Sequence, residues 1–345
     1  MKLNYEKIFN SVDLQKLKNK RILITGANGL IGGFLAEFFD YLNKKHSYNI
    51  NLILTSLSKK PKRIEKLLDD YTYISADLSK DTLDLTNWLH YHGEENINYC
   101  FYCAGYAQPS KFMSRPNETI ALNTLGLNNL FSQIFKDNPQ AKCIFLSSSE
   151  VYSANKTNDS HKEKDLISVD IDNKRNFYIL GKLGGESIVN NFRTKGFDAI
   201  SARVSLCYGP GILQDDARVM SEFVQKGLTQ EYIQLFDEGM ASRRYLHIED
   251  FTVMLLNTTL FGKSGLYNIS GEEENSIYEL ACIVGERLNK EVKKGKSNNL
   301  VSSTAPKIVW NSLDRYNSEF SKPNFKPLKE GVLEFIDWYI DEFNY

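Results

Sequence analysis

Short apolar segments alternate with longer amphipathic segments from Lys20 to about Arg203. The short segments predict strands at residues 21–25, 50–55, 71–75, 98–103, 142–147 and 198–204. The amphipathic segments between them predict helices at residues 29–43, 62–69, 83–90, 116–136 and 177–195. Strands separated by helices indicate a parallel sheet with helices on both faces, and such sheets bind ligands at the carboxyl ends of their strands.

The pattern is less regular after Arg203. Turn residues around Tyr208 precede a helix, and a strand–loop–strand unit at 234–248, a helix, a strand at 266–269 and helices from Ser276 and Leu328 follow. We therefore expect an α/β fold with a Rossmann-type doubly wound parallel sheet at residues 20–204, to which residues 246–270 return. A smaller, interleaved C-terminal lobe comprises residues 205–245 and 271–345. Residues 1–19 form an N-terminal extension with room for one amphipathic helix.

Glycines separate the first predicted strand from its helix. Gly26 permits a tight turn, Gly29 lets backbone N–H groups approach a pyrophosphate, and Gly32 allows close helix–strand packing. The alternative is a glycine-rich turn without a ligand, but strand, turn and helix are all in place. The segment therefore predicts a dinucleotide site. Its expected loop residues are Gly26, Asn28, Gly29, Leu30, Ile31 and Gly32.

The second predicted strand ends without the carboxylate that commonly binds the adenosine ribose 2′-hydroxyl. Neutral residues up to Ser58 occupy this end, and Lys59, Lys60 and Arg63 follow. A 2′-phosphate would meet lysines there and no repelling carboxylate. We therefore expect NAD(P) as the cofactor, with NADP slightly favoured over NAD, and contacts from Ser58 and Lys59. The alternative is that these lysines form a solvated loop.

Composition narrows the possible partners. The formal net charge is −1, so no global basic field favours nucleic acid or a membrane surface. The charged N-terminus lacks a signal peptide, and no window approaches the roughly 18 to 20 apolar residues of a membrane span. We expect a cytoplasmic protein. Cys100 and Cys103 lie in an apolar run typical of a buried strand, with no second pair to complete a zinc site, so we expect no metal.

Further motifs follow the glycine loop in a fixed order. They are Asp77-Leu78, Ala104-Gly105, Asn123, the segment LSSSEVY with Ser148 to Glu150, Tyr178-Ile-Leu-Gly-Lys182, and Ser242-Arg243-Arg244-Tyr245. Over residues 20–340 the chain resembles the extended short-chain dehydrogenase/reductase family of nucleotide-sugar epimerases, dehydratases, decarboxylases and reductases. The resemblance implies that the cofactor is contacted by Asp77, Leu78, Ala104, Gly105, Asn123, Tyr178 and Lys182. It also implies a nucleotide-diphosphate sugar as the substrate.

The same resemblance suggests where the substrate and a second subunit bind. Ser149 is expected at the sugar, and Arg243, with Arg218 second, at the phosphates; surface salt bridges are the alternative for both arginines. The resemblance also implies a homodimer in which the helices at 116–136 and 177–195 pair across a two-fold axis.

The chemistry expected of Tyr178 and Lys182 follows from their spacing. Residues i and i+4 share one face of a helix. A free tyrosine has a pKa of about 10, and a nearby ammonium and an oxidised nicotinamide both favour the phenolate. Tyr178 then takes a proton from a sugar hydroxyl, or donates one to a ketone, as hydride moves at nicotinamide C4. Ser148 is expected to hydrogen-bond the same oxygen.

Small departures from the family motifs indicate which reaction of the family this chain favours. Dehydratases of the family carry an aspartate where this chain has Ser149, so dehydration is disfavoured. UDP-glucuronate decarboxylases match Ser148-Ser149-Glu150, but their C-terminal arginine has no counterpart at residues 309–314. Reduction of a 4-keto sugar and 4-epimerisation need only Ser148, Tyr178 and Lys182. Glu150 is then a second acid/base or a structural carboxylate. A non-catalytic dinucleotide sensor is the alternative of another class.

Overall fold

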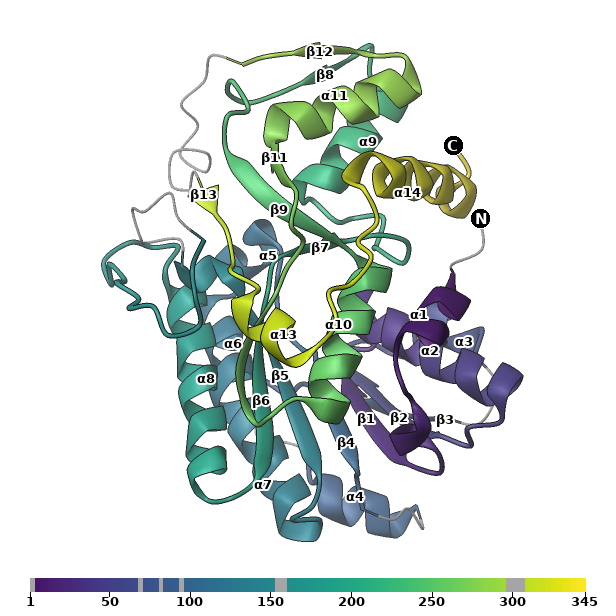
Figure 1. Ribbon diagram of the computed structural model, residues 1–345, viewed down its shortest axis with the longest axis vertical. Coiled ribbons are helices and arrows are strands. Elements are labelled where there is room, and N and C mark those ends of the chain that lie inside the picture. Colours follow the sequence, from purple (N-terminus) through teal and green to yellow (C-terminus); the bar gives the residue numbers. More distant parts are fainter. Residues whose placement is uncertain (1–3, 68–70, 81–82, 93–95, 153–159, 296–307) are drawn as a thin grey trace.

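The computed structural model describes residues 4–67, 71–80, 83–92, 96–152, 160–295 and 308–345. Its main sheet has seven parallel strands in the order β10-β6-β5-β4-β1-β2-β3 (Figure 1). Their bounds are β1 Arg21–Thr25, β2 Asn51–Ser56, β3 Tyr71–Ser75, β4 Tyr99–Tyr102, β5 Lys142–Ser148, β6 Asp198–Val204 and β10 Gly265–Ile269. The first six agree with the predicted strands to within one residue at each end. The Rossmann-type fold is confirmed, and the order of its strands reverses between β1 and β4.

Helices cover both faces of this sheet. On one face lie α1 (Tyr5–Ser11), α2 (Leu30–His46) and α10 (Ile248–Phe261), which pack against Ile22 and Ile24. On the other lie α4 (Leu85–Tyr91), α7 (Leu127–Asp137) and α8 (Phe177–Thr194), which pack against Leu23. Because alternate strand residues enter opposite cores, the central strands carry consecutive apolar residues, as in Ile22-Leu23-Ile24 of β1. No helix in the described part of the chain is long and apolar enough to cross a membrane.

The helix predicted at residues 116–136 is interrupted. It begins as α6 (Pro116–Ala121), passes through a π-helical turn, η2 (Leu122–Gly126), and continues as α7. At this turn Gly126 lies so close to the end of β3 that an added Cβ would be 2.0 Å from the Leu78 carbonyl oxygen. Single π-helical turns occur often at functional sites. Two further short helices are α3 (Lys62–Glu65), which ends earlier than predicted, and α5 (Pro109–Ser114).

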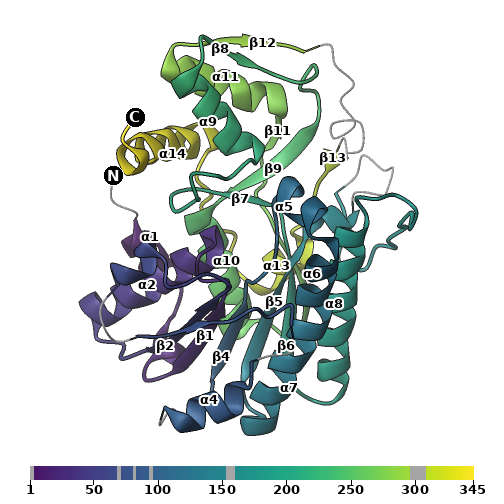
Figure 2. The same cartoon turned by 180° about the vertical axis from the view of Figure 1, so that it is seen from behind.

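A smaller lobe lies at the end of the main sheet where β6 leads into β7 (Leu206–Tyr208) (Figures 1 and 2). In it β9 (Ser242–His247) pairs with β7, β11 (Glu274–Ser276) and β13 (Ile308–Val309). Its helices α9 (Val219–Thr229), α11 (Ile277–Leu288) and α14 (Leu328–Phe343) share a separate apolar core. The strands β8 (Tyr232–Gln234) and β12 (Glu291–Lys293) form a small parallel pair, and α13 (Asp314–Glu319) packs on β10.

The N-terminal extension packs onto the main domain. Ile8, Leu14 and Leu17 are fully or almost fully buried in the same core as α2 and α10. Lys7 Nζ lies 2.7 Å from Asp250 Oδ1 at the start of α10. The helix expected in this extension is present as α1, followed by a single 3₁₀ turn, η1 (Gln15–Leu17). The extension therefore braces the outer side of the helix layer that carries α2.

Candidate active site

The glycine loop has the backbone geometry of a phosphate-binding turn. Gly26 has a φ of +66°, and an added Cβ would lie 2.9 Å from the backbone of Cys103 and Ala104. A Cβ on Gly32 would lie 2.5 Å from the Gly26 carbonyl oxygen, so the helix could not approach the turn with a larger residue there. Gly29 caps α2 without a side-chain hydrogen bond. The first N–H groups of α2 are therefore available to an anion.

A pocket of about 340 Å³ opens beside this turn, at the carboxyl ends of β1, β2, β3 and β4. Eight of the predicted cofactor residues line it: Gly26, Asn28, Gly29, Ser58, Asp77, Leu78, Ala104 and Gly105. The other predicted cofactor residues do not line it, namely Leu30, Ile31, Gly32, Lys59, Asn123, Tyr178 and Lys182. Sequence reasoning missed Tyr106, Lys111 and Leu122, which also line the pocket. The pocket and the turn together fit a dinucleotide.

The end of β2 presents hydroxyl groups to this pocket. Ser56 Oγ lies 3.1 Å from Ser58 Oγ and 2.6 Å from the Tyr73 hydroxyl, and Asn28 Nδ2 lies 3.4 Å from Ser58 Oγ. Lys59 is exposed nearby, and Lys60 Nζ lies over the Tyr71 ring, 4.8 Å from its centroid. The adenosine end of the pocket is therefore polar and lacks a carboxylate on β2.

Arg63 follows these lysines in the sequence, but its guanidinium is engaged elsewhere in the fold. Its guanidinium donates to both oxygens of Glu37 on α2, at 2.6 and 2.7 Å. It also donates to the Gly211 carbonyl oxygen at 2.7 Å. Through these hydrogen bonds the Arg63 side chain connects α2 with the segment that follows β7. The sequence could not show this, because Glu37 and Gly211 are distant from Arg63 along the chain.

Asp77 lies at the pocket as an ionised carboxylate. Burial alone would raise its pKa, but hydrogen bonds from Ser79 and Lys80 lower the pKa below its ordinary value. The Ser79 hydroxyl donates to Asp77 Oδ1 at 2.6 Å, and Lys80 Nζ lies 3.2 Å from Oδ2. The carboxylate is thus held in place and can accept hydrogen bonds from a ligand in the pocket.

The structure brings Ser148, Tyr178 and Lys182 together at the start of α8. Tyr178 is buried and stacks on Phe112 at 4.6 Å and 15°, and the Ser148 hydroxyl lies close enough to favour its phenolate. Lys182 Nζ donates to the Leu146 carbonyl oxygen at 2.8 Å and lies 5.8 Å from the Tyr178 ring centroid. A Cβ on Gly105 would be 3.6 Å from the same Nζ. The lysine therefore connects the phenol with the dinucleotide pocket.

Burial dominates the protonation of both groups. It raises the pKa of Tyr178 well above the ordinary value and Glu150 adds to this, whereas Ser148, Arg175 and Arg218 act in the opposite direction. Burial lowers the pKa of Lys182 to about 8, although Cys103 and Glu186 oppose this. In the protein alone the pKa of Tyr178 is therefore raised, and the lowering expected from Lys182 together with an oxidised nicotinamide stays a prediction for the cofactor-bound site. The ammonium is directed at a carbonyl, and desolvation of the phenolate outweighs it.

Glu150 is not an isolated carboxylate. It lies in a 3₁₀ turn after β5, η3 (Ser149–Tyr152), and both of its oxygens accept hydrogen bonds from Arg175 Nη2, at 3.2 and 3.1 Å. The Arg175 guanidinium also lies 5.2 Å from the Phe112 ring centroid. Sequence reasoning missed Arg175, because no motif includes it. A basic residue three positions before Tyr178 was the available signal.

The predicted substrate residues lie around this group. Ser149 is buried beside Glu150. Arg218, at the N-cap of α9, forms an ion pair with Asp216 at 2.9 Å and is close enough to lower the pKa of Tyr178. Arg243, on β9, donates to the Ser242 carbonyl oxygen at 2.7 Å, and burial lowers its pKa. Three guanidinium groups, of Arg175, Arg218 and Arg243, thus surround the phenol and its neighbouring carboxylate.

Asn123 lies in the π-helical turn under α8. Its Nδ2 donates to the Thr119 carbonyl oxygen at 2.7 Å. Its Oδ1 is buried and has no hydrogen-bond partner among the described residues. Buried polar atoms are rarely left unpaired, so this oxygen is available to a water or a ligand. The residue does not line the pocket at β1, and its predicted cofactor contact stays a prediction.

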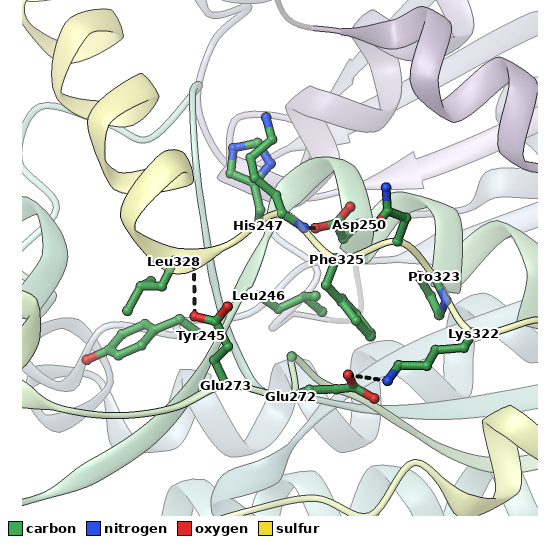
Figure 3. A pocket seen from close by; sticks show the side chains of 13 residues that line it. Tyr245, Leu246, His247, Asp250, Glu272, Glu273, Lys322, Pro323, Phe325 and Leu328 are labelled. Carbon is green, nitrogen blue, oxygen red and sulfur yellow. Dashed lines mark hydrogen bonds and ion pairs between the residues drawn. The ribbon is translucent and has the colours of Figure 1, made fainter.

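A second pocket, of about 260 Å³, lies between the start of α10 and the segment before α14 (Figure 3). Its walls carry opposite charges that pair: Lys322 Nζ lies 2.8 Å from Glu272, and the Leu328 N–H donates to Glu273 at 3.1 Å. His247 at its edge is buried, and burial lowers its pKa well below the ordinary value. None of the predicted site residues lines this pocket.

A phosphate-binding turn at the point where the strand order of a parallel sheet reverses, with a half-buried serine and a buried tyrosine and lysine beside it, defines a dinucleotide-dependent enzyme of the Rossmann type. The chain belongs to the NAD dependent epimerase/dehydratase family, whose sequence model matches residues 22–270. This match confirms the resemblance predicted from the motifs. It also confirms the predicted class, an NAD(P)-dependent enzyme of the nucleotide-sugar epimerase/dehydratase family.

Individual proteins resemble the chain over most of its length. A dTDP-4-dehydro-6-deoxy-D-allose reductase of Streptomyces sp. is 26% identical over 326 residues, 93% of this chain and 96% of that protein. UDP-glucuronic acid decarboxylase 1 of Xenopus tropicalis is 22% identical over 277 residues, 79% of this chain and 61% of that protein. The dTDP-glucose 4,6-dehydratase of Bacillus anthracis, solved with NAD, is 18% identical with a TM-score of 0.76, covering 94% of this chain and 98% of that one.

Proposed function

We propose that the chain is an NAD(P)-dependent enzyme that acts at C4 of a nucleotide-diphosphate sugar, by reduction of a 4-keto sugar or by 4-epimerisation. The observation that carries the proposal is the convergence of Ser148, Tyr178 and Lys182 next to the dinucleotide pocket. The family supports this class of reaction, and the similar Streptomyces reductase carries a 4-keto sugar nucleotide in its name.

Tyr178 is the proton-transfer group in this mechanism. Ser148 hydrogen-bonds the phenol and orients it, and the sugar oxygen at C4 would lie against both hydroxyls. Tyr178 donates its proton to the carbonyl oxygen in the reductive direction and accepts a proton from the hydroxyl in the oxidative direction. When bound, the nicotinamide supplies or takes up the hydride at C4. Its positive charge in the oxidised form would offset the burial that raises the pKa of Tyr178.

Lys182 holds the nicotinamide side of the site. With its Nζ between the Leu146 carbonyl oxygen and Gly105, the lysine is placed to hydrogen-bond the ribose of a bound cofactor. The uncapped N-terminus of α2 would bind the pyrophosphate, and Asp77 the adenosine end. We propose Asn123, through its unpaired Oδ1, as a partner of a water at the base of the site.

Two observations argue against dehydration. The position of the expected acid is Ser149, which cannot protonate a departing hydroxyl at neutral pH. The neighbouring Glu150 is paired with Arg175 through both oxygens, so it is not a free base. We therefore assign Glu150 a structural role and leave proton transfer to Tyr178. Arg218 and Arg243 are proposed to bind the diphosphate. Arg218 would then contact the diphosphate while it remains paired with Asp216.

Decarboxylation of a UDP-glucuronate-like substrate is the second candidate. The triplet Ser148-Ser149-Glu150 favours it, and so does similarity to the Xenopus decarboxylase. No arginine occupies residues 309–314, but the three guanidinium groups around Tyr178 supply positive charge that could hold a sugar carboxylate. The two candidates differ in the substrate they need and in whether CO₂ is released.

We also propose a preference for NADP and a homodimer. The preference rests on the absence of a carboxylate at the end of β2, and Lys59 remains a candidate partner of a 2′-phosphate. The dimer rests on exposed apolar side chains of Ile120 and Leu125, which are 40% and 46% exposed on the helix next to α8. A second copy would cover them.

The decisive experiment identifies the cofactor and then the reaction. Protein purified without added nucleotide is denatured, and the released nucleotide is identified by mass spectrometry. A second, native sample of the protein is then assayed with 4-keto sugar nucleotides and NADH or NADPH, with UDP-hexoses for epimerisation, and with UDP-glucuronate for CO₂ release. Tyr178→Phe is the matched control. Exchanging NADPH with ketone reduction supports the reductase, and retained NAD points to epimerisation or decarboxylation. Absence of turnover despite dinucleotide binding would favour a sensor.

A further inference from the structure

We infer that Arg175 is a positioning residue that holds Glu150 as an ion pair beside Tyr178 and offsets the charge of the carboxylate at the phenol. The inference rests on the proposed role of Tyr178 as the proton-transfer group. It assigns a task to a residue that lies outside the motifs by which the family is recognised in this sequence.

The geometry ties the three side chains into one unit. Arg175 Nη2 lies 3.2 and 3.1 Å from the two oxygens of Glu150. The side chains are only 12% and 23% exposed, so water screens the pair weakly. Arg175 precedes Tyr178 by three residues, and both contact the Phe112 ring, the guanidinium at 5.2 Å and the phenol at 4.6 Å. Arg175 thus binds Glu150 directly and shares the Phe112 ring with Tyr178.

Several charged or polar groups face Tyr178. Glu150 from the turn after β5 disfavours the phenolate, whereas the Ser148 hydroxyl and the guanidinium groups of Arg175 and Arg218 favour it. The ammonium of Lys182, farther along α8, lies over the ring. Arg218 is already paired with Asp216, so its net effect on the phenol is reduced. Arg175 is therefore the cation that directly compensates the one carboxylate shown to act on Tyr178.

Removal of Arg175 has a definite consequence. Glu150 would keep its negative charge but lose its partner, and an unpaired carboxylate beside the phenol disfavours the phenolate. The titration of Tyr178 then moves to higher pH. Removal of Glu150 alone leaves a bare guanidinium and moves the titration to lower pH. Removal of both charges cancels the two effects. A purely structural role would not produce opposite shifts from the two single substitutions.

The test measures the titration of Tyr178 without requiring turnover. The protein is labelled with ¹³Cζ-tyrosine, saturated with NAD⁺ and titrated by NMR; the Tyr178 signal is assigned by its loss in Tyr178→Phe. Wild type is compared with Arg175→Gln, Arg175→Lys, Glu150→Gln and the double variant Glu150→Gln/Arg175→Gln. Arg193→Gln, at the far end of α8, is the matched control. Thermal unfolding checks that each variant is folded.

The expected midpoints are highest for Arg175→Gln and lowest for Glu150→Gln, with a shift of about one pH unit, or tenfold in the ionisation constant, for each. Arg175→Lys, the double variant and Arg193→Gln should stay near wild type. Equal titration midpoints of Tyr178 in wild type, Arg175→Gln and Glu150→Gln would overturn the inference. So would two single substitutions that shift in the same direction. Failure to find any substrate would refute the proposed function but leave these shifts unchanged.

Discussion

Arg63→Met is the perturbation that most directly separates structure from cofactor recognition. Arg63 makes three hydrogen bonds of 2.6 to 2.7 Å, two to Glu37 and one to the Gly211 carbonyl oxygen. Breaking one side of a buried pair typically costs about 3–5 kcal/mol. Here Glu37 is 23% exposed and still accepts from the Tyr5 hydroxyl at 3.1 Å. We therefore expect Arg63→Met to lower the free energy of unfolding by about 2–3 kcal/mol.

Urea unfolding of wild type and variant, followed by circular dichroism, measures this loss. The double variant Glu37→Gln/Arg63→Met should recover part of it, because no unpaired charge remains. Titration of each protein with NADH and NADPH should give the same ratio of affinities. A loss of less than about 0.5 kcal/mol would refute the bridging role, since that is the range of ordinary surface substitutions. A selective loss of NADPH binding would instead identify Arg63 as a ligand of the 2′-phosphate.

The remaining predictions address the catalytic group, the π-helical turn and the oligomer. Tyr178→Phe should remove most turnover but leave the affinity for the cofactor within a few-fold in a fluorescence titration; turnover equal to wild type would contradict the mechanism. Because the pKa of Lys182 falls from 10.5 to about 8 on folding, the unfolded chain binds the extra proton between these values. The stability of wild type relative to Lys182→Met should therefore rise from pH 8 to 10.5, and a flat difference would refute the shift. Gly126→Ala should destabilise the protein by more than about 2 kcal/mol, because its Cβ would overlap the Leu78 carbonyl; a neutral effect would show that the turn can relax. Light scattering should give twice 39.6 kDa, and a concentration-independent monomer mass would rule out the dimer.

The strand pattern and the glycine loop were predictable because they depend on local chemistry. The strand β1 carries the apolar run Ile22-Leu23-Ile24, since both faces of the sheet are covered. Gly26 and Gly32 were identifiable because only glycine allows the turn and the close approach that the fold needs there. Tyr178 and Lys182 were found because residues four apart on a helix necessarily share a face.

Boundaries within helices were less predictable. The pattern of residues 116–136 predicts one amphipathic helix, but in the structure a π-helical turn at Leu122–Gly126 interrupts it. The close contact of Gly126 with Leu78 accompanies this turn, and it joins residues that are distant along the chain. Periodicity alone cannot reveal such a contact, because it records only which face of a helix is apolar.

The sequence by itself determined the class of fold, the glycine turn and the shared helix face of Tyr178 and Lys182, because each depends on residues that are close along the chain. The tertiary structure decided how charges are used. It paired Arg63 with Glu37 and Arg175 with Glu150, and it buried Tyr178 enough to raise its pKa. Charge pairing and desolvation depend on distances between separate elements, and these are set only when the chain has folded.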